Sequence, residues 1–215
     1  MPLVLSTKIL TPTQKKHLFL ANLSLVEYNA VSILELETAL DNASIENAIF
    51  TSQNAVKILY SNSITIKNAF CVGDKTAALL KQQGVDIVAS ATNAEILADE
   101  IVKNYSNRRY NFFCSKQRRK ELPAILKANQ IKLQEHHIYD SISNYKTFNN
   151  QFDAILCFSP LGVKSYYGTN KVKPLAICIG ETTAKTAKEY TGQVIISNKT
   201  SIESVIIKAI KTLTV

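Results

Sequence analysis

The chain has 215 residues and a hydrophobic content of 46%, which suffices for one large domain or two small ones with real cores. Its net charge of +8 favours anionic partners, but the lysines are scattered and few aromatics lie among them, which argues against nucleic-acid binding. No apolar run approaches the roughly 20 residues of a membrane-spanning helix, and the N-terminus lacks a signal-peptide pattern. We therefore expect a cytoplasmic protein without a membrane partner.

Short apolar runs alternate with helical patterns along the chain. From the N-terminus, the expected strands are residues 3–5, 48–50, 69–72, 85–88, 111–114, 136–140, 153–158, 175–179 and 193–197. The expected helices are residues 11–23, 54–60, 75–83, 93–105, 121–129, 160–168, 182–190 and 201–211. Apolar strands that alternate with helices are typical of parallel sheets covered on both faces. The sequence therefore predicts an α/β fold.

A repeat at half the length of the chain predicts two similar lobes. Residues 71–82 align with residues 178–189, and five of the twelve positions are identical. To match the first lobe, the second needs a strand and a helix that the N-terminus can supply. We therefore expect one flavodoxin-like lobe made of residues 1–32 plus 144–215, with a second such lobe, residues 33–143, inserted into it. The repeated segment is interpreted as the same strand-to-helix turn in each lobe.

The turns after the expected strands carry short polar motifs. In parallel α/β sheets ligands bind at the carboxyl ends of the strands, and backbone N–H groups and hydroxyls at helix starts bind anions. The candidate binding residues in these turns are Thr51, Ser52, Thr76, Asn93, Ser115, Lys116, Ser159, Gly180, Thr182 and Thr183. Each alone is explained by helix capping or a tight turn, so only their convergence favours an anion site. The repeated turn lacks the Lys-Ser/Thr ending of a phosphate-binding loop.

The remaining candidates are basic, aromatic or metal-ligating. All four arginines lie between residues 108 and 119, and Arg119 follows the strand 111–114 at the expected ligand edge. Tyr139 ends a strand where the chain leaves the inserted lobe, and both a cleft position and simple packing stay open for it. The adjacent pair His136 and His137 points to opposite faces of a strand, and no C-x-x-C motif is present, so we predict no metal site.

Seven segments, in their order and spacing, are similar to one known family. They are FTSQNAV (50–56), VGDKTAALLKQQG (72–84), TNAEILADEI (92–101), CSKQRRKELP (114–123), IYDS (138–141), FSPLGV (158–163) and IGETTAKTA (179–187). Over nearly its whole length the chain resembles uroporphyrinogen-III synthase. The resemblance implies two α/β lobes joined by a two-stranded hinge, no metal or organic cofactor, and a monomer.

The resemblance also implies a reaction and roles for residues. The substrate would be hydroxymethylbilane, handed over from hydroxymethylbilane synthase, and the product uroporphyrinogen III with its last pyrrole ring inverted. Tyr139 matches the family's recurrent tyrosine, proposed as a general acid. The residues that match the family's cleft-lining positions are Thr51, Ser52, Thr76, Asn93, Ser159, Thr182 and Thr183. The chain departs from the family at Ser115, where a glycine is common, and at Glu181, where many members have proline. Two alternatives stand beside this interpretation: a non-enzymatic two-lobed binding protein, disfavoured by the missing signal peptide, and a basic nucleic-acid-binding module, disfavoured by the absent aromatic platforms.

Overall fold

A computed structural model describes residues 1–38, 44–61 and 64–214, and the chain divides into two compact units. Unit 1 consists of residues 1–32 and 142–215, and unit 2 consists of residues 33–141. We propose that these units are the two domains of the protein. None of the described helices combines the length and the apolar character that crossing a lipid bilayer requires.

Unit 1 contains a five-stranded sheet in which every described strand pair is parallel. Its strands are β1 (Leu3–Ser6), β2 (Ser24–Glu27), β9 (Ala154–Cys157), β10 (Leu175–Cys178) and β11 (Val194–Ile196). Its helices are α1 (Pro12–Leu20), α6 (Pro160–Tyr167), α7 (Glu181–Lys188) and α8 (Ile202–Leu213). The strand order is β11-β10-β9-β1-β2, which in chain order is the flavodoxin-like 2-1-3-4-5 arrangement.

Unit 2 repeats this sheet in a permuted form. Its strands are β3 (Val31–Glu35), β4 (Ile45–Phe50), β5 (Ile66–Val72), β6 (Asp86–Ala91), β7 (Arg109–Ser115) and β8 (Lys132–Ser143). Its helices are α2 (Gln53–Ser61), α3 (Asp74–Gln82), α4 (Ala94–Asn104) and α5 (Glu121–Ala128). The order β6-β5-β4-β7-β8 equals that of unit 1 when the repeated strands β5 and β10 are superposed, and β3 adds an edge beside β8.

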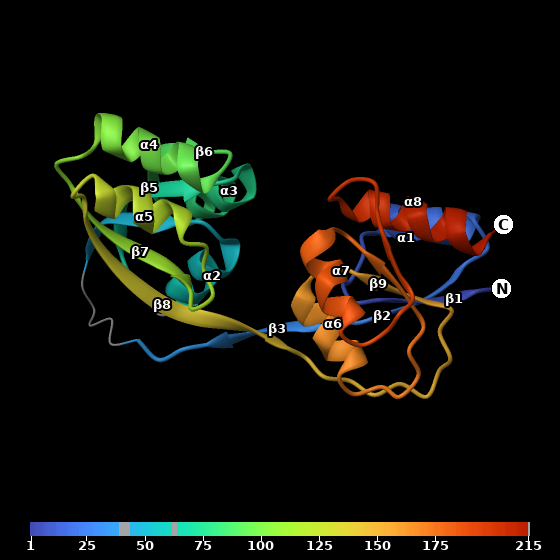
Figure 1. Cartoon of the computed structure of the whole chain (residues 1–215). Coiled ribbons are helices and arrows are strands. Elements are labelled where there is room, and N and C mark those ends of the chain that lie inside the picture. The colour runs from blue at the N-terminus through green and yellow to red at the C-terminus, as the bar shows by residue number, and fades with distance from the viewer. Residues whose placement is uncertain (39–43, 62–63, 215) are drawn as a thin grey trace. The chain divides into compact units, whose positions relative to one another are not determined.

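Helices cover both faces of each sheet (Figure 1). In unit 2 one apolar core lies against α2 and α3 and includes Val56 and Leu80, and another lies against α4 and α5 and includes Leu97. In unit 1 the corresponding cores lie against α6 with α7 and against α1 with α8. Burial on both faces explains why the strands are continuous apolar runs, as the sequence indicated.

β3 and β8 carry the chain between the two units. The Leu36 N–H donates to the Ile138 carbonyl (3.0 Å), and the Asn144 N–H donates to the Ala30 carbonyl (2.9 Å). The partner numbers fall along β8 as they rise along β3, so these two strands are antiparallel. Both boundaries of unit 2 therefore lie inside one hydrogen-bonded strand pair.

Replacing Tyr60 on α2 by phenylalanine should stabilise the protein. The Tyr60 hydroxyl is buried and has no hydrogen-bond partner among the described residues, which costs about 1–3 kcal/mol of desolvation. We expect Tyr60→Phe to raise the free energy of unfolding by about 1 kcal/mol, measured from urea denaturation. Tyr110→Phe is the matched control, because the Tyr110 hydroxyl donates to the Tyr105 carbonyl (2.8 Å) and its loss should destabilise. Equal effects of the two variants would contradict this account.

Candidate functional site

A pocket of about 510 Å³ lies at the carboxyl ends of the strands of unit 2. It is lined by Thr51, Ser52, Val72, Thr92, Asn93, Ala94, Phe112, Ser115, Gln117, Arg118, Arg119, Leu122, Tyr139 and Ser141. Thr51 follows β4 and Ser115 ends β7, and the strand order reverses between these two neighbouring strands. Ligands of open α/β sheets bind at this kind of switch point. Among these lining residues none is acidic and two are arginines, so the pocket favours anions.

Tyr139 brings a phenol hydroxyl to this pocket and is buried, with 6% of the residue exposed. Burial raises the pKa of its phenol above the usual value of 10, and a hydrogen bond from Ser52 partly offsets this. The Ser52 Oγ accepts the Asn54 N–H (3.1 Å), so its own proton is available for the Tyr139 oxygen. The Tyr139 hydroxyl therefore stays protonated at neutral pH and can donate to a ligand.

The loop between β7 and α5 forms the basic wall of the pocket. Arg118 donates through Nε to the Glu135 carboxylate on β8. The Gln117 side-chain amide donates to the Ser141 carbonyl (3.2 Å), and the Lys116 N–H donates to the Tyr139 carbonyl (2.8 Å). These contacts tie the loop to β8, and Arg118 and Arg119 line the same pocket as Tyr139.

The start of α4 supplies a second kind of hydrogen-bond donor for an anion. Asn93 is its N-cap, and its Oδ1 accepts the Ile96 N–H (2.9 Å). Because that oxygen is used for capping, the Asn93 side chain offers its amide N–H groups to the pocket. The positive end of the helix dipole adds to this attraction for a carboxylate.

The structure brings most of the predicted residues of unit 2 together. Those that line the pocket are Thr51, Ser52, Asn93, Ser115, Arg119 and Tyr139. Lys116, exposed on the same loop, and Thr76, buried in the first turn of α3 with 5% exposure, are not among the lining residues. Arg108 and Arg109 line a different hollow with Asn47 and Asn68, at the opposite edge of the sheet.

The predicted residues of unit 1 follow strands β9 and β10. Ser159 is the N-cap of α6, where its Oγ accepts the Gly162 N–H (3.1 Å). Gly180 precedes α7, Thr182 is exposed in its first turn, and Thr183 is buried with 3% exposure. These residues therefore lie at the same edge of their sheet as the pocket residues do in unit 2.

Sequence reasoning missed four polar pocket residues: Thr92, Gln117, Arg118 and Ser141. Two of them had a usable signal, since Thr92 directly precedes the capping residue Asn93 and Arg118 directly precedes Arg119. Gln117, on the loop after β7, and Ser141, on β8, are brought together by a hydrogen bond that no local sequence pattern predicts.

The repeated turn differs between the two units in its backbone. Gly73 has φ +85°, which L side chains rarely adopt, whereas Gly180 is extended at φ −175°. We expect Gly73→Ala to lower the free energy of unfolding by about 1–3 kcal/mol through backbone strain alone, because its added Cβ meets no described atom within 4 Å. Gly180→Ala should change it by less than about 0.5 kcal/mol. Urea denaturation of both variants checks this difference, and equal losses would refute it.

Comparisons with known proteins identify the family. A model described as uroporphyrinogen-III synthase HemD matches residues 22–207. The crystal structure of uroporphyrinogen-III synthetase from Helicobacter pylori 26695 is similar over 99% of this chain and 100% of that one, with TM-score 0.72 and 18% identity. The crystal structure of a mutant uroporphyrinogen III synthase from the extremely thermophilic bacterium Thermus thermophilus is similar over 99% of this chain and 98% of that one, with TM-score 0.55 and 11% identity.

A search of curated sequences finds no significant match. The two solved structures confirm the predicted two-lobed α/β fold, and the family model carries the assignment of the chain. Because that model spans most of the sequence, from just after α1 into α8, the chain belongs to the uroporphyrinogen-III synthase family.

Proposed function

We propose that the pocket of unit 2 holds the reacting end of hydroxymethylbilane, with Tyr139 as the general acid. The protein is a uroporphyrinogen-III synthase, a cyclising lyase of haem biosynthesis that converts this linear tetrapyrrole to uroporphyrinogen III with inversion of the terminal ring. The observation that supports the pocket is the buried, protonated Tyr139 hydroxyl beside two arginines at the switch point of the sheet.

The charge of the pocket suits the side chains of this substrate, which are carboxylates. The Arg119 guanidinium, the amide of Asn93 and the hydroxyls of Thr51, Ser52 and Ser115 are the proposed partners in unit 2. A charged hydrogen bond to a carboxylate is roughly twice as strong as a neutral one. We propose Thr76 and Lys116, and in unit 1 Ser159, Gly180, Thr182 and Thr183, as further binding residues.

For this reaction the protein has to supply one proton and hold the substrate in a fixed geometry. Tyr139 donates its proton to the departing hydroxymethyl oxygen, which leaves as water while the pyrrole nitrogen supplies electrons to form an azafulvene cation. The substituted carbon of the terminal ring then attacks, and the resulting spiro intermediate fragments and closes again with the ring inverted. The proton lost from the carbon that makes the final bond returns to the Tyr139 phenolate, so the net change is the loss of one water. Orientation of such an intramolecular attack is worth about 7–11 kcal/mol.

Four further properties are part of the proposal. We infer a monomer located in the cytoplasm, with substrate received from hydroxymethylbilane synthase. No metal or organic cofactor enters the proposed steps, because the proton donor and the electron-rich pyrrole supply what the ring closure requires.

A product-isomer assay tests the proposed function. Purified protein is mixed with freshly made hydroxymethylbilane, and the oxidised products are resolved chromatographically into type I and type III porphyrins. We expect the type III isomer to dominate and to form faster than spontaneous closure. Type I product alone, at the spontaneous rate, would contradict the assignment.

Arg119→Gln should weaken substrate binding more than it slows chemistry. We expect KM to rise about tenfold, since a hydrogen bond to a charged group contributes about 1.5–3 kcal/mol and part of it is regained from water. Arg109→Gln is the matched control, because Arg109 lies at the opposite edge of the same sheet. Steady-state kinetics of both variants measures the difference, and an equal rise in KM would argue for a general charge effect instead.

A further inference from the structure

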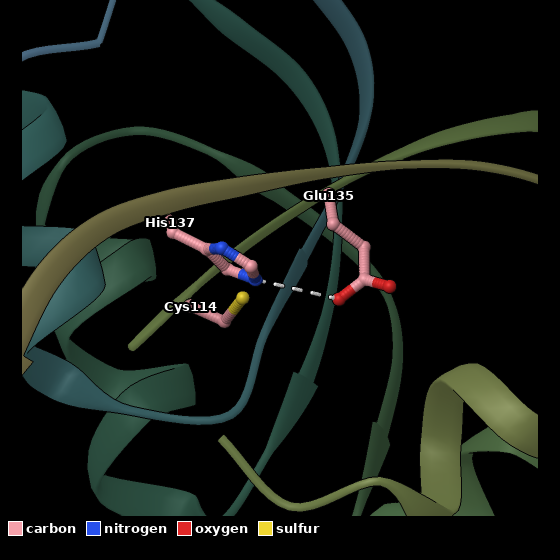
Figure 2. Close-up of side chains that lie close together, drawn as sticks. All are labelled: Cys114, Glu135 and His137. Carbon is pink, nitrogen blue, oxygen red and sulfur yellow. Dashed lines mark ion pairs between the residues drawn. The ribbon is translucent and has the colours of Figure 1, made fainter. Parts of the chain in front are cut away.

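A cluster of metal-ligating side chains lies on the sheet of unit 2. Cys114 on β7 pairs in register with His137 on β8, so both side chains project from the same face, and Glu135 lies two residues before His137. Their ligand atoms all lie within 4.8 Å of one another, and His137 Nε2 is 3.8 Å from Glu135 Oε2 (Figure 2). From the sequence we considered only the adjacent pair His136 and His137. The pairing of Cys114 with His137 across two strands could not be predicted from it.

The donor set has the chemistry of a zinc site. A thiolate, an imidazole and a carboxylate are the ligands that Zn²⁺ takes, and three of them with one open position form a common arrangement. Tetrahedral bonds of about 2.0–2.3 Å place the donor atoms roughly 3.3–3.6 Å apart. The donor atoms have to approach one another by at most roughly 1.5 Å, which side-chain rotation can supply because His137 is 45% exposed and Glu135 is 27% exposed.

The carboxylate of this cluster, on Glu135, already forms an ion pair with Arg118. The Arg118 guanidinium pairs with Glu135 through Nε and lies close enough to Cys114 to influence its thiol. The Cys114 thiol donates to the His136 carbonyl (3.7 Å), so it carries its proton in this arrangement. In this structure the negative charge of the cluster, on Glu135, is therefore neutralised by Arg118.

We propose that Cys114, Glu135 and His137 form a binding site for Zn²⁺ or a similar borderline-soft divalent ion, which displaces Arg118 from Glu135. On binding, the Cys114 thiol loses its proton to solvent and Glu135 exchanges Arg118 for the ion. The thiolate and the carboxylate together balance the two charges of the metal. This metal site takes no part in the ring closure, and the proposal for it does not depend on the proposed reaction.

The site is coupled to the pocket through Arg118. The same guanidinium lines the pocket, so an ion at the cluster releases it from Glu135 and changes the basic wall. Coupling of this kind is reciprocal, and an anion that holds Arg118 in the pocket favours the metal equally.

Titration with Co²⁺ as a spectroscopic probe for Zn²⁺ tests the proposal. The wild-type protein should bind one ion per chain and show an intense near-ultraviolet thiolate charge-transfer band. Cys114→Ser should abolish the band, and His137→Ala should weaken binding at least about tenfold, because each removes a ligand. Arg118→Gln should tighten binding about tenfold, because Glu135 no longer has to release a competing cation.

Cys71→Ser is the matched control, since Cys71 is a buried thiol on β5 of the same unit and is not part of the cluster. It should bind Co²⁺ as the wild type does. Competition by Zn²⁺ should remove the band in both proteins. A band that survives in Cys114→Ser, unchanged affinity in His137→Ala, or weaker binding by Arg118→Gln would each overturn the proposal. Thermal unfolding of every variant confirms that it is folded before titration.

Discussion

Tyr139→Phe should lower the turnover of hydroxymethylbilane by about 10²–10⁴-fold, the usual contribution of a general acid. The ring stays in place, and only the buried hydroxyl that Ser52 holds is removed. Turnover should not vanish, because the pyrrole assists departure and the pocket still orients the chain. The measurement is kcat at saturating substrate together with the ratio of type III to type I product, which should fall as spontaneous closure takes over.

The control for this result is Tyr60→Phe. Tyr60 is a partly buried tyrosine of the same unit whose hydroxyl has no partner in the described part of the chain, and it does not line the pocket. Its turnover should equal that of the wild type. If Tyr139→Phe kept full turnover while both variants were folded, Tyr139 would be a packing residue and the proton would have to come from elsewhere.

Phe113→Ala should unfold unit 2 selectively. Phe113 is fully buried in β7 and stacks between Phe50 at 5.6 Å and His136 at 4.9 Å between ring centroids. Truncating a buried phenylalanine to alanine costs about 3–5 kcal/mol, a large part of the roughly 5–15 kcal/mol that stabilises a domain. Amide hydrogen exchange followed by mass spectrometry should show lost protection in residues 33–141 and retained protection in residues 144–214.

Leu156→Ala in unit 1 is the converse experiment, because Leu156 is fully buried on β9 in the core that α1 and α8 cover. It should lower protection in unit 1 and leave unit 2 protected. Simultaneous loss in both units, in either variant, would show that the chain unfolds as a single cooperative structure and that the two units are not domains.

The sequence was sufficient for the layered α/β architecture and for the edge that carries the site. Strands buried on both faces are apolar throughout, and the repeated segment ending at Cys71 and Cys178 marks two strands that occupy equivalent places, β5 and β10. The helix starts were recognisable because capping side chains such as Asn93 and Ser159 are local signals. Local rules therefore located most of the pocket before any tertiary contact was known.

The remaining parts of the site depend on contacts that are distant in sequence. Arg118 faces the pocket because Glu135, on the neighbouring strand, pairs with it. Thr76 matches Thr183 in the repeat, yet both are buried, since the first turn of each helix packs its third residue toward the sheet. Because the two segments are similar in sequence, their equivalent places in the sheets could be predicted, but not that Gly73 has a positive φ whereas Gly180 is extended.

Because β3 pairs with β8, unit 2 is a segment that could be deleted without breaking the sheet of unit 1. The chain enters it after Ala30 and has left it by Asn144, and these two residues are joined by a backbone hydrogen bond (2.9 Å). A short turn in place of residues 33–141 would therefore reconnect unit 1 as one continuous flavodoxin-like chain without threading or strand exchange.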